Sequence, residues 1–110
     1  MIDSICIIVK RPPGEEKSTL GLRASYATLM SAIDTKLLFI EEGVYGLLKN
    51  TGYNAEMLRD FIKEDGEVYC TQGSLDDKGL GQDDIVSGVR IIPEKEVAEI
   101  IEESNSVAMF

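Results

Sequence analysis

Short apolar runs alternate with longer amphipathic segments along the whole chain. Runs rich in β-branched, apolar or aromatic residues are typical of strands buried on both faces of a parallel sheet. The predicted strands are residues 5–9, 36–40, 67–70, 89–92 and 106–110. Apolar residues at three- and four-residue spacing between these runs predict helices. Those helices begin near Ser18, Val44, Asn54, Ser74 and Pro93.

Strands that alternate with helices at these intervals favour a parallel sheet with right-handed crossovers and helices on both faces. No repeat, linker or low-complexity stretch interrupts residues 1–110. We therefore expect an α/β fold, a single doubly wound three-layer domain with a parallel sheet of about five strands. In such a sheet, ligands bind outside the carboxyl ends of the strands, so the residues that follow each strand are the first candidates for function.

Composition narrows the classes of function. The apolar fraction is 44% and the formal net charge is −9, so a concentrated basic surface for direct nucleic-acid binding is not expected. No apolar run reaches the roughly 18 residues that cross a membrane, and the first residues lack the features of a signal peptide. The sequence thus predicts a soluble cytoplasmic protein without membrane contact.

The chain has two cysteines and no histidine. Without histidine, Ser-His and Cys-His nucleophile pairs cannot form, and a zinc site is disfavoured. The loop after residue 9 carries Lys17-Ser18-Thr19 but no GxxxxGK[ST] or GxGxxG motif. Glu15 and Glu16 would also repel a phosphate there. We expect no cofactor and no metal, and any chemistry falls to a thiol, carboxylates, lysines or backbone amides.

The turn after the second predicted strand is acidic. Glu41 and Glu42 precede Gly43, and adjacent residues of a strand point to opposite faces, so the two carboxylates converge poorly on one ligand. We interpret Glu41 and Glu42 as solvated or partner-facing residues.

The two cysteines differ in their place along the chain. Cys6 lies inside an apolar strand run, where a free cysteine behaves as a small hydrophobic residue. Cys70 is the last residue of its predicted strand and precedes a predicted short helix, whose backbone amides would stabilise a thiolate. Gly73 would let the backbone of a partner approach, and Lys78 would add positive charge.

The cap of that short helix is expected at Ser74, because Ser74 and Asp77 have the spacing of a capping box. Asp76 and Asp77 oppose the charge of Lys78, so the direction of any shift in the pKa of the Cys70 thiol stays open. On the residues alone, Cys70 is either a reactive thiol or a half-buried residue at a strand end.

Three segments together resemble the DsrE/DsrF-like sulfur-relay family, nearest to its DsrF/TusC branch. They are the acidic-Gly-Val-aromatic turn within residues 39–48, the Tyr69-Cys70 strand end with the helix that closes on Lys78-Gly79-Leu80, and the apolar ending at residues 107–110. The resemblance covers nearly the whole chain and keeps the order of the elements. It implies one DsrE/DsrF-like domain over residues 1–110 with a DsrEFH/flavodoxin-like fold.

The resemblance also implies a function. Members of the family pass sulfane sulfur, as a cysteine persulfide, during tRNA 2-thiouridine synthesis or sulfur oxidation. They assemble into trimers or hexamers, from one chain or with related DsrE/TusD-like and DsrH/TusB-like subunits. Cys70 corresponds to the carrier position, which would exchange sulfur with donor and acceptor proteins. The chain would then be a sulfur carrier or sulfurtransferase subunit and not a stand-alone turnover enzyme.

Three hypotheses remain open from the sequence. The first is a sulfur carrier that uses Cys70. The second is a non-catalytic structural subunit of a sulfur-relay complex, with the carrier thiol on a sister subunit and Glu41 and Glu42 serving assembly. The third is a small-molecule-binding domain of flavodoxin-like topology in which no thiol takes part.

Overall fold

The computed structural model describes residues 3–49 and 52–110. Its strands form one sheet of five parallel strands in the order β4-β3-β2-β1-β5, with ladders that pair β1 with both β2 and β5. The strands are β1 (Ser4–Val9), β2 (Asp34–Phe39), β3 (Glu67–Thr71), β4 (Val89–Ile92) and β5 (Ser106–Met109). The expected α/β fold with a parallel sheet is confirmed.

Within residues 3–49 and 52–110, four α-helices and three 3₁₀ segments connect the strands. The α-helices are α1 (Glu16–Met30), α2 (Tyr53–Lys63), α3 (Gln72–Asp77) and α4 (Val97–Glu103). The 3₁₀ segments are η1 (Glu41–Leu47), η2 (Gln82–Asp84) and η3 (Glu94–Glu96).

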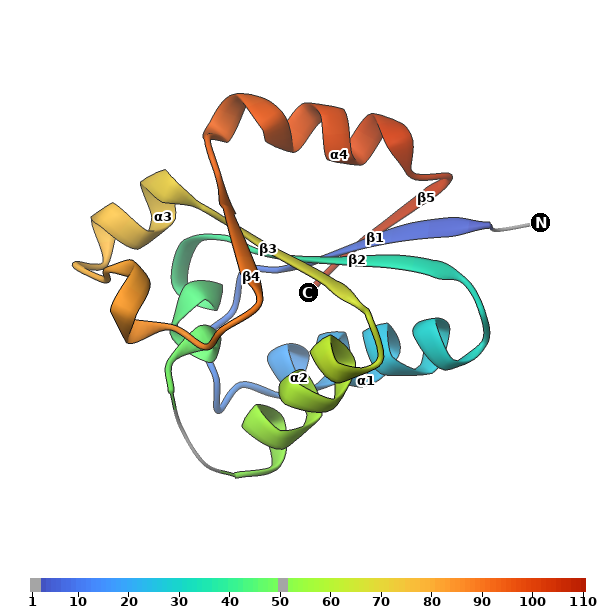
Figure 1. Cartoon of the computed structure of the whole chain (residues 1–110), viewed down its shortest axis with the longest axis horizontal. Coiled ribbons are helices and arrows are strands. Elements are labelled where there is room, and N and C mark those ends of the chain that lie inside the picture. The colour runs from blue at the N-terminus through green and yellow to red at the C-terminus, as the bar shows by residue number, and fades with distance from the viewer. Residues whose placement is uncertain (1–2, 50–51) are drawn as a thin grey trace.

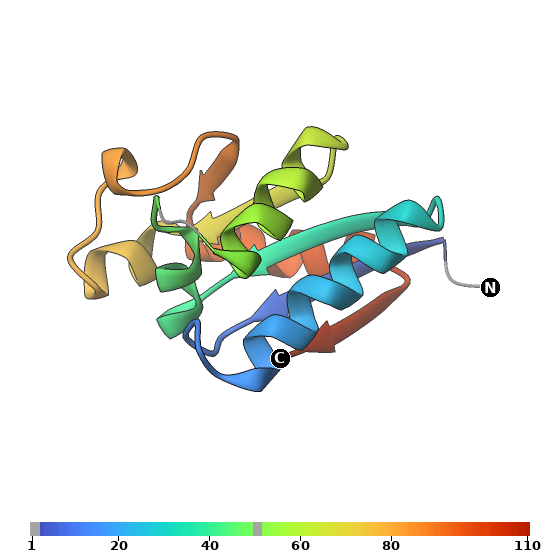
Figure 2. The same ribbon diagram turned by 90° about the horizontal axis from the view of Figure 1, so that it is seen from below.

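The helices cover both faces of the sheet. Figure 1 shows α1 and α2 on one face and α4 on the other, and Figure 2 shows α1 and α2 in front of the sheet with α4 behind it. The short α3 and η1 lie together beyond the carboxyl ends of the strands. This end is therefore built from short segments, while the long helices hold the two faces.

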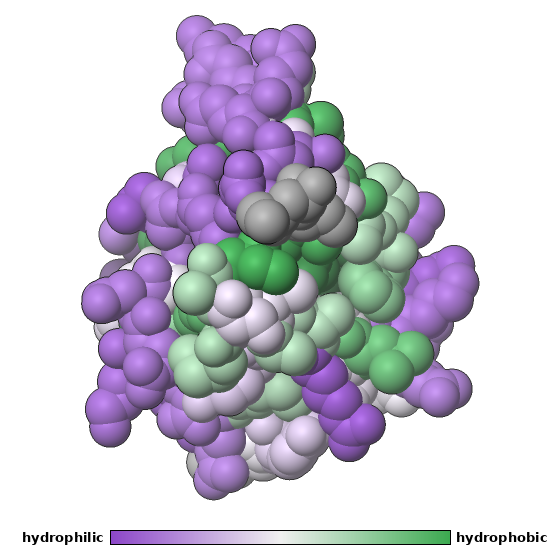
Figure 3. Space-filling model, turned by 90° about the vertical axis from the view of Figure 1, so that its right-hand side faces the viewer, coloured by the Kyte–Doolittle hydropathy of each residue, from purple (hydrophilic) through white to green (hydrophobic). Residues whose placement is uncertain are grey.

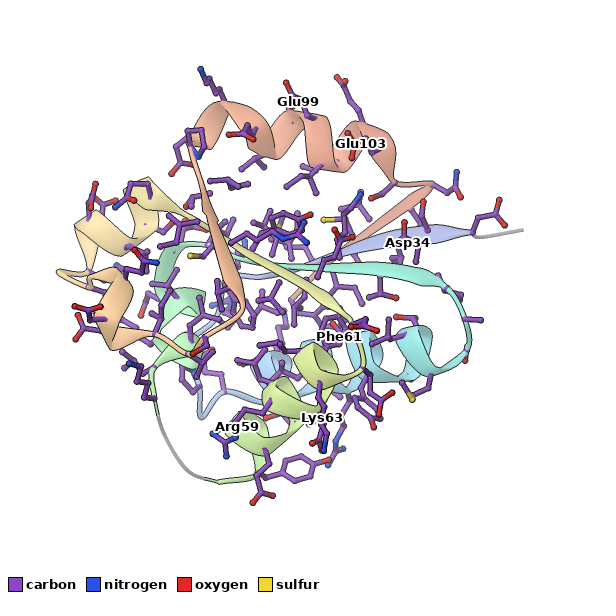
Figure 4. The ribbon with its side chains drawn as sticks, in the orientation of Figure 1. Asp34, Arg59, Phe61, Lys63, Glu99 and Glu103 are labelled. Atoms are coloured by element: carbon purple, nitrogen blue, oxygen red, sulfur yellow. The ribbon has the colours of Figure 1, made fainter. Side chains whose placement is uncertain are left out.

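Each face of the sheet has its own core. The core beneath α1 and α2 contains Val9, Phe39, Phe61 and Cys70 among its fully buried residues. Figure 4 shows Phe61 on the side of α2 that turns toward the sheet. The core beneath α4 is smaller and includes Cys6. Because side chains alternate along a strand, every strand with both faces covered must be apolar throughout.

The helix α4 presents a strongly acidic outer surface. Glu99 projects away from the sheet in Figure 4, whereas Glu103 reaches inward and its Oε2 lies 3.2 Å from Nζ of Lys36. The upper part of the surface in Figure 3, where α4 lies, is correspondingly hydrophilic. Among the described residues, no helix is both long and apolar enough to cross a membrane.

Several predicted boundaries are wrong. The first helix begins at Glu16, two residues before the predicted start at Ser18, and β2 begins at Asp34, two residues before the predicted strand at 36–40. The predicted helix at Val44 is a 3₁₀ segment that begins at Glu41. The short helix after β3 begins at Gln72 with Thr71 as its N-cap, so Ser74 lies inside the helix. These errors fall where short segments meet at the carboxyl edge of the sheet.

Candidate functional site at the carboxyl end of β3

Cys70 lies one residue before the end of β3, at the edge of the sheet where function was expected. It pairs with Phe39 of β2 and Ile91 of β4, and its residue is 0% exposed. It belongs to the core cluster that also contains Val44 of η1 and Leu75 of α3. The prediction that Cys70 ends its strand is wrong, because Thr71 occupies that position and the thiol lies in the core.

Burial governs the chemistry of this thiol. Desolvation raises the pKa of Cys70 from 9.0 to about 11, because the thiolate loses its hydration in an apolar environment. The expected help from Lys78 does not arise, since Lys78 caps the far end of α3. The helix α3 has six residues, so it is about 9 Å long, and it lies between Cys70 and Lys78 in the chain. Cys70 is therefore protonated and shielded in this conformation.

A small hydrogen-bond network joins the ends of β2 and β3 beside Cys70. The Ser74 hydroxyl oxygen accepts from the Glu41 backbone N–H at 2.9 Å and from the Thr71 hydroxyl at 2.7 Å. The Ser74 N–H donates to Oγ1 of Thr71 at 3.4 Å, which caps α3. We call Glu41, Thr71 and Ser74 the Ser74 network; it holds η1 and α3 in place over this end of the core.

The acidic turn is shaped by two backbone requirements. Glu41 has a φ of 51°, a left-handed conformation that is unfavourable for a residue with a Cβ. The hydrogen bond from its N–H to Ser74 helps to hold it there. Gly43 packs against the backbone of Val9, where a Cβ would overlap the Val9 carbonyl group. The glycine of the acidic-Gly-Val-aromatic turn is thus needed for a close approach between η1 and β1.

Glu41 and Glu42 are both exposed to solvent, and a contact with a partner stays a prediction. They line a surface depression of about 200 Å³ together with Lys10 and Arg11 from the loop after β1. Two acidic and two basic side chains therefore meet at this part of the carboxyl edge. The charges balance, and the depression is distinct from the buried Cys70.

Gly73 does not offer the open approach expected of it. The carboxyl group of Glu94, from η3, lies directly over its Cα and occupies the space that a Cβ would take. A partner backbone could reach Gly73 only if the Glu94 side chain moved. The acidic group also gives no support to a thiolate in the same region, since like charges disfavour each other.

Thr71 is the residue of this region that sequence reasoning missed. The sequence does indicate that Thr71 can cap the helix, because threonine is a common N-cap residue and Thr71 directly follows the predicted strand, three residues before Ser74. The pattern from Ser74 to Asp77 indicates a cap at Ser74 just as well, when only neighbouring residues are considered. In the structure the Ser74 N–H donates to Oγ1 of Thr71, which makes Thr71 the cap, and the Ser74 hydroxyl accepts from the Glu41 N–H, 33 residues away in the chain.

A five-stranded parallel sheet covered by helices on both faces defines an α/β protein. Comparison with known proteins identifies its family. The model of the DsrE/DsrF-like family matches residues 3–110. The chain is 24% identical to a protein TusC homolog of Aliivibrio fischeri over 107 residues, covering 90% of this chain and 91% of that protein. It is 26% identical over 117 residues to an uncharacterised protein of Methanopyrus kandleri, with 99% and 95% covered.

Solved structures share the fold. The crystal structure of the YchN protein of E. coli superposes with a TM-score of 0.84 at 23% identity, covering 100% of both chains. A protein of unknown function from Methanobacterium thermoautotrophicum has a TM-score of 0.74 at 16% identity, covering 96% of each chain. This chain belongs to the DsrE/DsrF-like family, a family of sulfur-relay proteins that act in complexes.

Proposed function

We propose that this chain is a sulfur-relay subunit that carries sulfane sulfur on Cys70, and that it does so only when α3 and η1 open. The observation that carries the proposal is the position of Cys70, next to last in β3 and directly before the helix cap at Thr71. The other cysteine, Cys6, lies in the middle of β1. Cys70 is thus the thiol that a movement of short edge segments can uncover.

The transfer step is a thiol-persulfide exchange. The Cys70 thiolate attacks the terminal sulfur of a donor persulfide, a new S–S bond forms at Sγ, and the donor sulfur leaves as a thiolate. An acceptor thiolate then removes the terminal sulfur and restores the Cys70 thiolate. The exchange involves no net oxidation, so it needs no cofactor or metal.

The closed conformation suppresses this reaction. With a pKa of about 11, the thiol is ionised to roughly one part in ten thousand at pH 7. Opening would admit water, remove the desolvation that raises the pKa, and expose the sulfur to a donor. The Ser74 network is the part of the cover that a partner could break, because it joins α3 to η1 through one hydroxyl oxygen.

Loading with a small-molecule persulfide tests the proposal without a protein partner. Intact mass should show slow addition of one sulfur atom, reversed by a reducing thiol and absent in Cys70→Ser. Ser74→Ala should load faster, whereas Ser87→Ala, at an exposed serine outside the network, should load like the wild type. If neither the wild type nor Ser74→Ala gains sulfur at Cys70, the carrier proposal is overturned.

A second candidate function is favoured by the complete burial of Cys70. In this alternative the chain is a supporting subunit, and a related DsrE/TusD-like or DsrH/TusB-like chain holds the carrier thiol. Exposed Glu41 and Glu42 would then contact a basic partner surface. Here Cys70→Ser would leave sulfur transfer by the complex intact, while Glu41→Lys with Glu42→Lys would disperse the complex on size-exclusion chromatography.

A further inference from the structure

A cavity of about 350 Å³ lies beyond the carboxyl ends of β1 and β2, away from Cys70. We call it the α1–α2 cavity, because it lies between the first turns of those two helices, which run side by side in Figures 1 and 2. Its lining residues are Pro13, Ser18, Leu22, Gly46, Gly52, Tyr53, Asn54 and Ala55. The volume is sufficient for a small organic molecule, and open α/β sheets bind their ligands at this edge.

The hydroxyl group of Ser18 points to a ligand in this cavity. Ser18 is 2% exposed, and its Oγ makes no hydrogen bond with the other described residues. Within the described chain, every fully covered side-chain nitrogen or oxygen has a hydrogen-bond partner. The small exposed part of Ser18 therefore includes its Oγ, which faces the cavity that Ser18 lines. A buried hydroxyl of this kind is completed by a bound group or by water.

Two helix N-termini meet at the same cavity. The Glu15 side chain, at the N-cap of α1, makes no capping hydrogen bond, and Gly52, the N-cap of α2, has no side chain that could make one. The first backbone N–H groups of a helix lack intrahelical partners and carry partial positive charge. The two ends are held together by hydrogen bonds between Thr19 and Asn54, with Nδ2 of Asn54 3.1 Å from Oγ1 of Thr19. The donors are thus fixed before a ligand arrives.

The charges around the cavity limit what can bind. None of the lining residues carries a formal charge, and Glu15, Glu16 and Glu56 lie in or next to the first turns of the two helices. A multiply charged anion would be repelled, whereas one negative charge suits the partial charges of two helix ends. At the rim, the Arg23 guanidinium lies 5.5 Å from the ring centre of Tyr53.

The remaining wall is apolar and small. Leu22 and Pro13 offer aliphatic surface, and Gly46 lines the cavity with backbone alone, since a Cβ at this position would point at the Phe39 ring. From these observations we infer that the α1–α2 cavity binds a small organic monocarboxylate. The carboxylate accepts hydrogen bonds from Ser18 Oγ and the first N–H groups of α2, and an apolar body packs on Leu22 and Pro13. This site is independent of sulfur transfer by Cys70.

Two-dimensional ¹H–¹⁵N NMR titration of the full chain tests the inference. The probes are hexanoate and benzoate, with hexylamine as the cationic control and inorganic phosphate as the multiply charged control. We expect the carboxylates to shift the amide signals of Ser18, Gly46 and residues 52–55 in a saturable manner. Hexylamine and phosphate should leave those signals in place.

Ser18→Ala should weaken carboxylate binding about tenfold or more, because a hydrogen bond to a charged group is lost. The matched control is Ser31→Ala, which removes a hydroxyl from the exposed cap at the other end of α1 and should bind as the wild type does. Unchanged binding to Ser18→Ala, equal binding of hexylamine, or scattered non-saturable shifts would each overturn the inference. So would the absence of binding by both carboxylates, with the spectrum showing a folded chain.

Discussion

The burial of Cys70 predicts that its thiol is nearly inert in the isolated chain. The residue is 0% exposed, and desolvation raises the pKa of its thiol from 9.0 to about 11. At pH 8, a thiol with a pKa of 9.0 is about one-tenth ionised, and one with a pKa of 11 about one-thousandth. Ionisation alone therefore slows alkylation about a hundredfold, and the need for local opening slows it further.

The assay is alkylation by iodoacetamide at pH 8, followed by peptide mass spectrometry that reports Cys6 and Cys70 separately. Free cysteine and the chain unfolded in guanidinium provide the reference rates. We expect native Cys70 to react at least about a hundredfold more slowly than these references. Alkylation of native Cys70 within tenfold of free cysteine would refute the reasoning from burial.

Ser74→Ala should make Cys70 more reactive. The substitution removes the hydroxyl oxygen that accepts from the Glu41 N–H and the Thr71 hydroxyl, which destabilises the contact between η1 and α3 by about 1–2 kcal/mol. If local opening at α3 limits the reaction, alkylation of Cys70 accelerates about 5- to 30-fold. Cys6 lies in the other core and should react as in the wild type. Equal acceleration of both cysteines would indicate global unfolding and contradict opening at α3.

Three further predictions concern stability, measured by thermal or urea unfolding. Glu41→Gly should stabilise the chain by about 0.5–1 kcal/mol, because glycine accepts the left-handed conformation; Glu42→Gly, without a positive φ, should not stabilise it. Gly43→Ala should destabilise the chain by about 2 kcal/mol or more, because the added Cβ would overlap the Val9 carbonyl. Gly46→Ala should destabilise it by less than about 1 kcal/mol. A larger loss for Gly46→Ala than for Gly43→Ala would contradict the packing argument. Because the pKa of Cys70 is higher in the folded than in the unfolded chain, the protonated thiol contributes roughly 2–3 kcal/mol to the free energy of unfolding; this contribution is complete below about pH 9 and is lost as the pH rises to about 11. Cys70→Ala should therefore lose less stability between about pH 9 and about pH 11 than the wild type, and an equal loss in the two proteins would contradict the argument.

The arrangement of the sheet could be predicted because local pattern and tertiary environment agree. Strand runs such as Ile5–Val9 are apolar at every position, which occurs when both faces are covered. The resemblance to the family also held over residues 3–110. The strand runs could be recognised because their residues are neighbours in the chain, and the family resemblance because it depends on many residues together.

The state of the candidate thiol could not be predicted in the same way. Cys70 is buried because η1 and α3 pack together at the edge of the sheet, and that contact joins segments about 30 residues apart. Thr71 and Ser74 are equally good caps by local pattern, and the local pattern does not show that the Ser74 hydroxyl accepts a hydrogen bond from the distant Glu41 N–H. Likewise, nothing in the local pattern indicates that Glu41, and not Gly43, takes the left-handed conformation in the acidic turn.

The separation of the two cysteines has a consequence for redox chemistry. Cys6 and Cys70 belong to different cores on opposite faces of the sheet, and β2 lies between their strands. Two strand spacings alone amount to about 9–10 Å, whereas a disulfide requires Cα atoms within about 7 Å. If Cys70 carries a persulfide, as proposed above, no resolving thiol lies within reach in the same folded chain. The sulfur would then leave by transfer to another molecule, because an internal disulfide with Cys6 cannot form in the folded state.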